Sequence, residues 1–178
     1  MKIKFLKFHP DAIIPKKAYD KDFCYDVYAV SEEEVAPNVW KYGLGFGLQI
    51  ERGDELFFQY QKSFEFLGVY TEQFISTEQF IRFQDSPISL SIDFRPRSSV
   101  WKTGMVLSNC VGTIDEGYTN EISAVFYHVL PDMPRYKVGD KIGQIKIGAT
   151  FPIEFVEVKE LDDTERGMRG YGSSDVIQ

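Results

Sequence analysis

The sequence predicts an all-β fold, a sandwich of short strands with at most short helical turns. Aromatic residues are abundant, with 15 Phe and 10 Tyr in 178 residues. Apolar and polar residues alternate with a period of two in six segments, and Pro and Gly residues separate these segments, which indicates half-buried strands joined by tight turns. The six segments comprise residues 2–8, 24–30, 43–50, 88–94, 122–129 and 153–158.

Length and charge limit the architectures and partners that are possible. A chain of 178 residues is long enough for one domain with its own hydrophobic core. The formal net charge of -7 works against broad attraction to DNA, RNA or an anionic membrane. We therefore expect no nucleic-acid partner and no membrane partner, and any phosphate binding must be local.

The first predicted strand, residues 2–8, alternates Lys with apolar residues and lacks a continuous apolar core. It therefore resembles neither a signal peptide nor a membrane span. Cys24 and Cys110 lie in apolar-looking segments without CxxC or Cys/His spacing, which favours buried reduced thiols in strands over a zinc site. Together these features favour a cytoplasmic protein.

The second predicted strand, residues 24–30, contains Asp26 within an apolar run. A carboxylate in such a strand costs several kcal/mol unless it is paired, hydrated or close to a cation. Three consecutive glutamates follow at residues 32–34, and we expect them in a loop.

The third predicted strand is followed by a Phe-rich stretch, residues 52–84, which favours extra strands. A short helix from Ser76, with Ser76 and Gln79 as a capping box, is the alternative. After the fourth strand, residues 98–103 predict one helical turn. Ser98 would lie near its N-terminus, where free N–H groups favour an anion, and Arg97 before it is a bidentate phosphate binder.

Residues 112–118, with the sequence Gly-Thr-Ile-Asp-Glu-Gly-Tyr, are the most informative motif. They place one carboxylate, Asp115, and one ring, Tyr118, on a Gly-flanked turn between two apolar runs. Alone, such an Asp is typical of a turn former or a cap, and such a Tyr of a core or a strand edge. The same turn can hold a carboxylate within reach of a water that attacks a phosphoanhydride.

Two further elements follow toward the C-terminus. A strand over residues 141–146 carries Gln144, which faces either solvent or a phosphate. Residues 162–178 mix Gly, Ser and charged residues, which is typical of a disordered tail. This tail also contains Arg166, a forked cation, and Tyr171, a ring for a flat base. We therefore expect one β domain, residues 1–161, followed by an arm, residues 162–178, that closes over a site.

The motifs resemble, in their order along the chain, those of the trimeric deoxyuridine triphosphate pyrophosphatase (dUTPase) family. The matching motifs are Cys24-Tyr-Asp-Val-Tyr-Ala29, Phe94-Arg-Pro-Arg-Ser-Ser99, residues 104–115, the segment ending in Gln144, and Arg166-Gly-Met-Arg-Gly-Tyr-Gly-Ser173. The resemblance implies a distorted jelly-roll (β-clip) fold and a homotrimer with shared active sites. It also implies Mg²⁺-dependent hydrolysis of dUTP to dUMP and pyrophosphate, and it makes residues 52–84 an insertion relative to the compact family core.

The resemblance also implies a role for each motif residue. Asp115 would activate the water that attacks the α-phosphorus, and Asp26 would hold Mg²⁺ through water. Asn109 would read the uracil edge, and the ring of Tyr118 would exclude a 2′-hydroxyl. The other implied substrate-binding residues are Arg97, Ser98, Ser99, Gly112, Ile114, Gln144, Arg166, Tyr171, Gly172 and Ser173.

Five positions depart from the family pattern, among them Thr119, which replaces an Arg after Tyr118. Ser99 and Arg169 each replace a Gly and add bulk, so we expect them to affect arm closure and substrate affinity. Tyr171 replaces a stacking Phe and keeps the ring. Asn120 replaces a Gly after Tyr118, which we interpret as tolerance of a positive φ angle.

Two other functions stay open. The related dCTP deaminases, including bifunctional deaminase/dUTPases, also carry Arg-Ser-Ser and Asp-x-Gly-aromatic motifs. They need a glutamate where this chain has Val125 and an Arg near Lys102, and valine cannot move a proton. The second alternative is a non-catalytic dUTPase-fold nucleotide-binding or regulatory protein, whose partner surface would be residues 52–84. The presence of Asp115 and Gln144 argues against a dead site.

Overall fold

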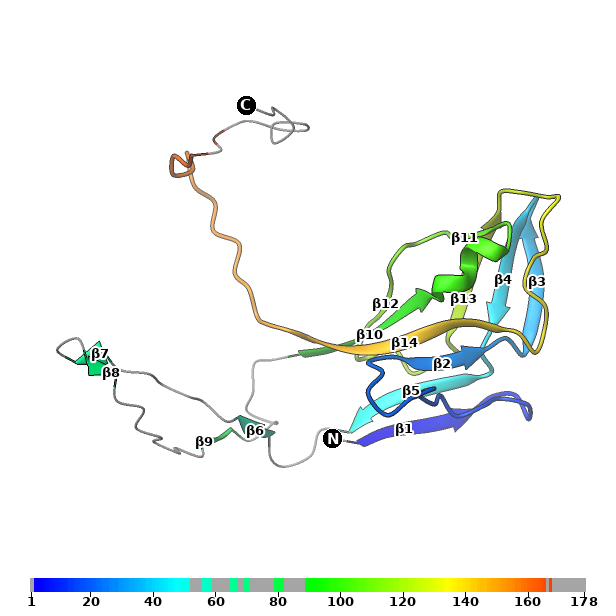
Figure 1. Ribbon diagram of the computed structural model, residues 1–178, viewed down its shortest axis with the longest axis horizontal. Helices are drawn as coiled ribbons and strands as arrows, with labels where there is room; N and C mark the ends of the chain where they lie inside the picture. Colours follow the sequence, from blue (N-terminus) through cyan, green and yellow to red (C-terminus); the bar gives the residue numbers. More distant parts are fainter. Residues whose placement is uncertain are drawn as a thin grey trace.

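Two four-stranded antiparallel sheets and a two-stranded sheet form the body of the protein (Figure 1). The computed structural model describes residues 2–51, 56–58, 65–66, 69–70, 79–81, 89–165 and 167. The prediction of an all-β fold is confirmed. Among the described residues, the one helical element is the 3₁₀ turn η2 (Ser98–Lys102), where a helical turn was predicted.

The first four-stranded sheet has the order β12-β10-β14-β2, and the second has the order β11-β13-β4-β3. Their strands are β12 (Gly112–Ile114), β10 (Ser89–Pro96), β14 (Lys141–Thr150), β2 (Tyr25–Tyr28), β11 (Met105–Leu107), β13 (Ser123–His128), β4 (Val39–Gly43) and β3 (Ser31–Ala36). The two-stranded sheet pairs β1 (Lys2–Lys7) with β5 (Phe46–Glu51).

Four short strands lie in the Phe-rich stretch that favours extra strands. β6 (Leu56–Phe58) pairs with β9 (Gln79–Ile81), and β7 (Glu65–Phe66) pairs with β8 (Val69–Tyr70). The described parts of the stretch are therefore strands, as expected. Gln79 belongs to β9, and Ser76, the first residue of the alternative helix, lies outside the described residues.

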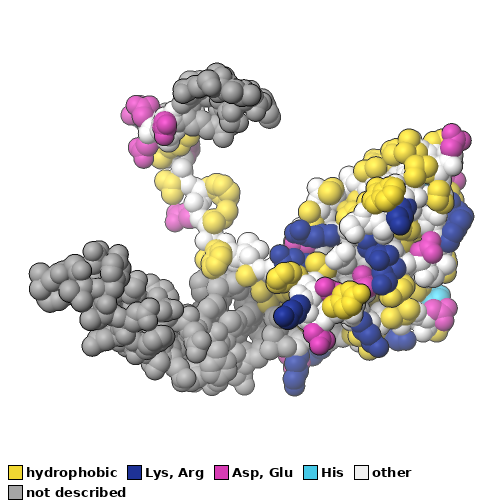
Figure 2. Space-filling view, viewed as in Figure 1, with side chains coloured by type: hydrophobic (Ala, Val, Ile, Leu, Met, Phe, Trp, Pro, Cys, Tyr) yellow, Lys and Arg dark blue, Asp and Glu magenta, His cyan; other side chains and the backbone are white. Residues whose placement is uncertain are grey.

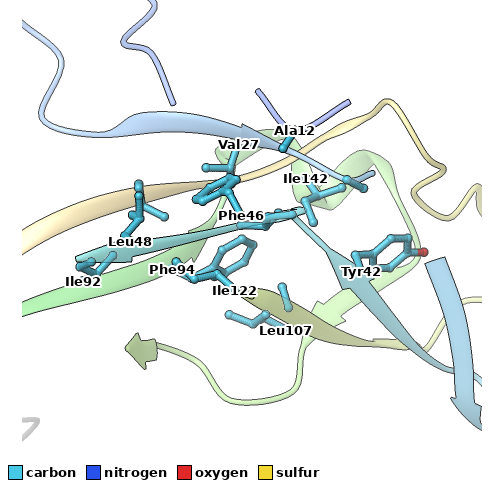
Figure 3. Close-up of a cluster of buried hydrophobic side chains, with 14 of the residues drawn as sticks. Ala12, Val27, Tyr42, Phe46, Leu48, Ile92, Phe94, Leu107, Ile122 and Ile142 are labelled. Atoms are coloured by element: carbon cyan, nitrogen blue, oxygen red, sulfur yellow. The ribbon is translucent and has the colours of Figure 1, made fainter. Parts of the chain in front are cut away.

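The hydrophobic core lies between the sheets. Inward-facing residues of β10 and β13 meet there, because successive side chains of a strand point to opposite faces. The rings of Phe94 and Phe126 pack edge to face with their centroids 6.2 Å apart. The ring centroids of Phe126 and Tyr136 lie 5.5 Å apart. Figure 3 shows Phe94, Leu107 and Ile122 gathered from three parts of the chain. Each such buried side chain stabilises the fold by about 1.5–3 kcal/mol.

Three sequence predictions about strands and loops are wrong. Residues 32–34 belong to β3, not to a loop, because β3 is an edge strand whose glutamates can reach solvent. The predicted strand at 43–50 is broken, since β4 ends at Gly43 and a corner at Gly45, with φ of 72°, precedes β5. Residues 153–158 form no strand and are exposed.

The predicted environment of the cysteines is also wrong. Cys110 is exposed and Cys24 is only partly buried, and neither residue lies in a strand. Both are free thiols, as expected. Within the described ranges, the structure contains no helix long and apolar enough to cross a membrane.

A partly buried ion pair joins β3 to the loop before β14. Nη2 of Arg135 lies 3.0 Å from Oε1 of Glu32, and the guanidinium also stacks 3.5 Å from the ring centroid of Trp40. The hydrogen bond from Arg135 lowers the pKa of Glu32, and burial opposes this effect. The pair therefore stabilises the fold only while Glu32 is ionised.

We expect Glu32→Gln to lower the free energy of unfolding by on the order of 1 kcal/mol at pH 7. Because the folded-state pKa of Glu32 lies below its ordinary value of about 4.3, the contribution is present above that value. It is lost as the pH falls through the folded-state pKa. Urea unfolding between pH 7 and pH 3, at one protein concentration, measures this difference.

Glu33→Gln is the matched control, because Glu33 is an exposed neighbour on the same strand. A difference between Glu32→Gln and the wild type that stays constant over this pH range would contradict the prediction.

Candidate functional site

A pocket of about 200 Å³ opens where β10, β11, β12 and the start of β13 come together. Its floor is apolar and buried, and its rim carries an amide, a carboxylate and a phenol ring. The residues that line it are Phe94, Leu107, Asn109, Gly112, Thr113, Ile114, Asp115, Tyr118, Ile122, Ser123 and Ala124. Five predicted site residues are therefore brought together: Asn109, Gly112, Ile114, Asp115 and Tyr118.

The turn that carries Asp115 is held to β10 on both sides. β12, directly before Asp115, pairs with β10 so that Asp93 lies opposite Thr113, and the Thr113 hydroxyl donates to Oδ1 of Asp93 at 3.2 Å. After Asp115, the carboxylate of Glu116 accepts a hydrogen bond from the N–H of Leu90 at 3.3 Å. These contacts fix the backbone on either side of Asp115.

Asp115 itself is exposed, and the N–H of Tyr118 donates to its carbonyl oxygen at 3.0 Å, which closes a β-turn. Within the described part of the chain, no group donates a hydrogen bond to the Asp115 carboxylate. This carboxylate is therefore held on a fixed backbone while its oxygens remain available to a ligand or a water.

Tyr118 is held by its hydroxyl group. The hydroxyl donates to the carbonyl oxygen of Glu121 at 2.9 Å, and the residue is 45% exposed, so part of the ring faces the open pocket. The interpretation of Asn120 is wrong, because its φ is not positive; among the described residues, Asn38 is the one non-Gly residue with positive φ. The Asn120 side chain instead accepts the N–H of Glu121 at 2.7 Å.

The other predicted phosphate binders do not line the pocket. Arg97 precedes η2 and is partly buried, and Ser98 and Ser99 begin that turn. Gln144 of β14 lies directly opposite Asp26 of β2. The remaining predicted site residues, Arg166, Tyr171, Gly172 and Ser173, lie outside the described residues.

A carboxylate in an apolar strand needs a partner, and Asp26 has a cationic one. Nζ of Lys141 lies 2.6 Å from Oδ2 of Asp26. Hydrogen bonding to Asp26 raises the pKa of Lys141. Oδ1 of Asp26 accepts no hydrogen bond from the described residues, so this oxygen is available to a further ligand.

Two residues that position the site were missed by sequence reasoning. Asp93 fixes β12 through Thr113, and Glu121 accepts a hydrogen bond from the Gly45 N–H at 2.9 Å. Asp93 occupies a polar position in the regular alternation of its strand, so the pattern itself does not mark it as a site residue. The partner of Glu121 lies 76 residues away, so spacing along the sequence gives no indication of it.

Comparison with known proteins places the chain in a family. The family model described as dUTPase matches residues 68–175. The chain belongs to the dUTPase family. A deoxyuridine 5′-triphosphate nucleotidohydrolase of Helicobacter pylori is 30% identical over 178 residues, covering 99% of this chain and 98% of the relative. The enzyme of the same name from Nautilia profundicola is 27% identical over 176 residues, which cover 98% of this chain and 99% of the relative. The prediction that the chain is an enzyme is confirmed.

Solved structures agree on the fold. A mutant dUTPase of Staphylococcus bacteriophage 80alpha, solved with dUpNHpp, has a TM-score of 0.66 at 16% identity, covering 97% of this chain and 98% of that one. A mutant dUTPase from phage phi11 of S. aureus, described with a structural Mg(II) ion, has a TM-score of 0.60 at 14% identity. The match covers 92% of this chain and 100% of that one. The predicted fold is therefore confirmed.

The packing behind the pocket gives a stability prediction. A Cβ at Gly143 would lie 2.3 Å from Cζ of Phe94 and 2.9 Å from the carbonyl oxygen of Arg95. Because Phe94 is buried and lines the pocket, we expect Gly143→Ala to destabilise the protein by about 1–3 kcal/mol. Gly117→Ala is the control, since a Cβ there would meet nothing within 4 Å. Equal urea midpoints for the two variants would contradict this account.

Proposed function

We propose that this enzyme hydrolyses dUTP to dUMP and pyrophosphate, with base and sugar bound in the pocket at the Asp115 turn. The observation that carries the proposal is the meeting of Asn109, Asp115 and Tyr118 around one apolar floor, in a chain of the dUTPase family. In this proposal a flat base would lie on the floor, and the phosphate chain would leave the pocket past the carboxylate at its rim.

Base recognition would rest on Asn109 and on the backbone of Gly112 and Ile114. Uracil presents a carbonyl acceptor where cytosine presents an amine donor. Cytosine would therefore leave buried partners unpaired, at a cost of about 1–3 kcal/mol for each. The ring of Tyr118 would cover the deoxyribose and leave no room for a 2′-hydroxyl.

Asp115 would act as the general base. Its carboxylate would accept a proton from a water as the water oxygen bonds to the α-phosphorus. The bond between the α-phosphorus and the oxygen that bridges to the β-phosphorus would break, and pyrophosphate would leave. The hydrogen bonds on both sides of Asp115 support this role, because a base must be held in line with the reacting atoms.

The phosphate chain would be bound by Arg97, Ser98, Ser99 and Gln144, and Arg166 would arrive with the arm that also carries Tyr171, Gly172 and Ser173. Arginine forks, hydroxyls and amides all donate to phosphate oxygens. These donors would hold the α-phosphorus in place for the attacking water.

The donor set near Asp26 fits Mg²⁺ bound through water. Among the described residues, no three His, Cys, Asp or Glu side chains are grouped to hold a metal ion. Mg²⁺ keeps several waters and needs only one or two carboxylates besides substrate phosphates, and Oδ1 of Asp26 is available. When bound, Mg²⁺ would neutralise phosphate charge.

A homotrimer with shared sites is supported by the segment after β14. All residues from 151 to 165 are exposed, and Figure 2 shows hydrophobic side chains along this segment. Phe155 is 91% exposed and Ile153 is 75% exposed. Exposed apolar side chains of this size favour contact with another protein surface, here a second copy of the chain. Sedimentation or scattering would measure the oligomeric state.

The proposal is tested by incubating the protein with Mg²⁺ and each of dUTP, dCTP, dTTP and UTP, while pyrophosphate and the base of the product are followed together. We expect pyrophosphate release selective for dUTP. Conversion of dCTP to a uracil nucleotide would replace the proposal with deamination, despite Val125. If the protein processes none of the four nucleotides, a binding or regulatory protein is favoured.

We expect Asp115→Asn to lower kcat for dUTP by 10²-fold to 10⁴-fold, the usual contribution of a general base. The amide keeps the shape of the side chain and the exposed turn, so KM and thermal stability should change little. Asp132→Asn, at another exposed aspartate outside the pocket, is the matched control. Full turnover by Asp115→Asn would remove the assignment of the base.

A further inference from the structure

Glu121 connects the ring of Tyr118 to the corner between β4 and β5. Its backbone carbonyl oxygen accepts the Tyr118 hydroxyl at 2.9 Å, and its side-chain Oε1 accepts the N–H of Gly45 at 2.9 Å. One residue therefore joins the exposed ring at the pocket rim to a distant part of the chain.

The corner that receives the Glu121 carboxylate is fixed. Gly45 has a φ of 72°, and a Cβ there would lie 2.6 Å from Cγ2 of Val30. On either side of it, the N–H of Leu44 donates to the carbonyl of Ile122, and the N–H of Ile122 donates to the carbonyl of Phe46, both at 2.9 Å. The Gly45 N–H is thus a donor at a set position.

The turn also rests directly on β5. A Cβ at Gly47 would lie 2.5 Å from the carbonyl oxygen of Thr119 and 3.0 Å from that of Asn120. The backbone between Tyr118 and Glu121 therefore lies flat on this strand. Glu121 contributes the side-chain hydrogen bond that ties the end of the turn to the neighbouring corner.

We propose that Glu121 is a positioning residue that sets the height of the Tyr118 ring and so contributes to discrimination between 2′-deoxyribonucleotides and ribonucleotides. The inference rests on the proposed function, in which that ring covers the sugar. Exclusion of a hydroxyl group is steric, so a ring that is free to move by a fraction of an ångström admits it. Loss of the carboxylate would leave the Gly45 N–H without its partner and release the turn.

The test compares Glu121→Ala with Glu121→Gln, which keeps an acceptor oxygen at the same place. We expect the ratio of kcat/KM for dUTP to kcat/KM for UTP to fall about tenfold in Glu121→Ala, the effect of one hydrogen bond. Glu121→Gln should retain the wild-type ratio. Tyr118→Phe, which removes the other hydrogen bond to Glu121 and keeps the ring, should also lower the ratio.

The ratio separates positioning from general destabilisation, because a smaller folded fraction lowers the rates for both substrates equally. Glu33→Ala, the same change at an exposed glutamate of β3, is the control. An unchanged ratio in Glu121→Ala and Tyr118→Phe would overturn the inference while leaving dUTP hydrolysis intact.

The dissociation constants of dUMP and UMP, measured by calorimetry on the same variants, give a readout that needs no turnover. If the wild type binds dUMP more tightly than UMP and Glu121→Ala loses this preference, the inference holds even where hydrolysis is absent. If the wild type binds the two equally, the inference is wrong whatever the reaction is.

Discussion

The edge-to-face contact between Phe94 and Phe126 is the interaction on which the two sheets depend. Phe94 lies on β10 in one sheet and Phe126 on β13 in the other, and their exposures are 2% and 0%. The contact requires Gly143 on the neighbouring strand, because any side chain there would occupy the space of the Phe94 ring. The same ring lines the pocket, so the packing that joins the sheets also forms the floor of the site.

The inward position of Phe94 determines which face of the sheet the other side chains of β10 point to. Because strand residues alternate between faces, Asp93 on the other face is free to bind Thr113. β12 is thereby held against β10, and the chain leaves it directly into the turn of Asp115. The turn ends at Glu121 and Ile122, which are bound to the corner between β4 and β5. The turn at Asp115 is therefore held by β10 at one end and by the corner between β4 and β5 at the other.

Sequence patterns predicted the strands whose alternation reflects a buried face, such as β10 and β13. They failed at residues 153–158, where apolar residues alternate without a neighbouring strand in the described chain, because alternation measures amphipathicity and not pairing. Of the predicted site residues, those that line one pocket are close in sequence, from Asn109 to Tyr118. Glu121 was missed because its role depends on a contact with Gly45, and only the folded chain brings these residues together.

Alternation along β14 also bears on the proposal that sites are shared between subunits. Gln144 lies beside Arg95 and Asp26, whereas its neighbour Ile145 is buried beside Phe94. Gln144 therefore faces away from the pocket floor, and turning it inward would need a shift of one residue that exposes Ile145. If the proposed reaction uses the pocket together with Gln144 and Asp26, these two residues can come from the outer face of a second copy of the chain. The strand period therefore fits the proposal, which comes from the family resemblance, that sites are shared between subunits.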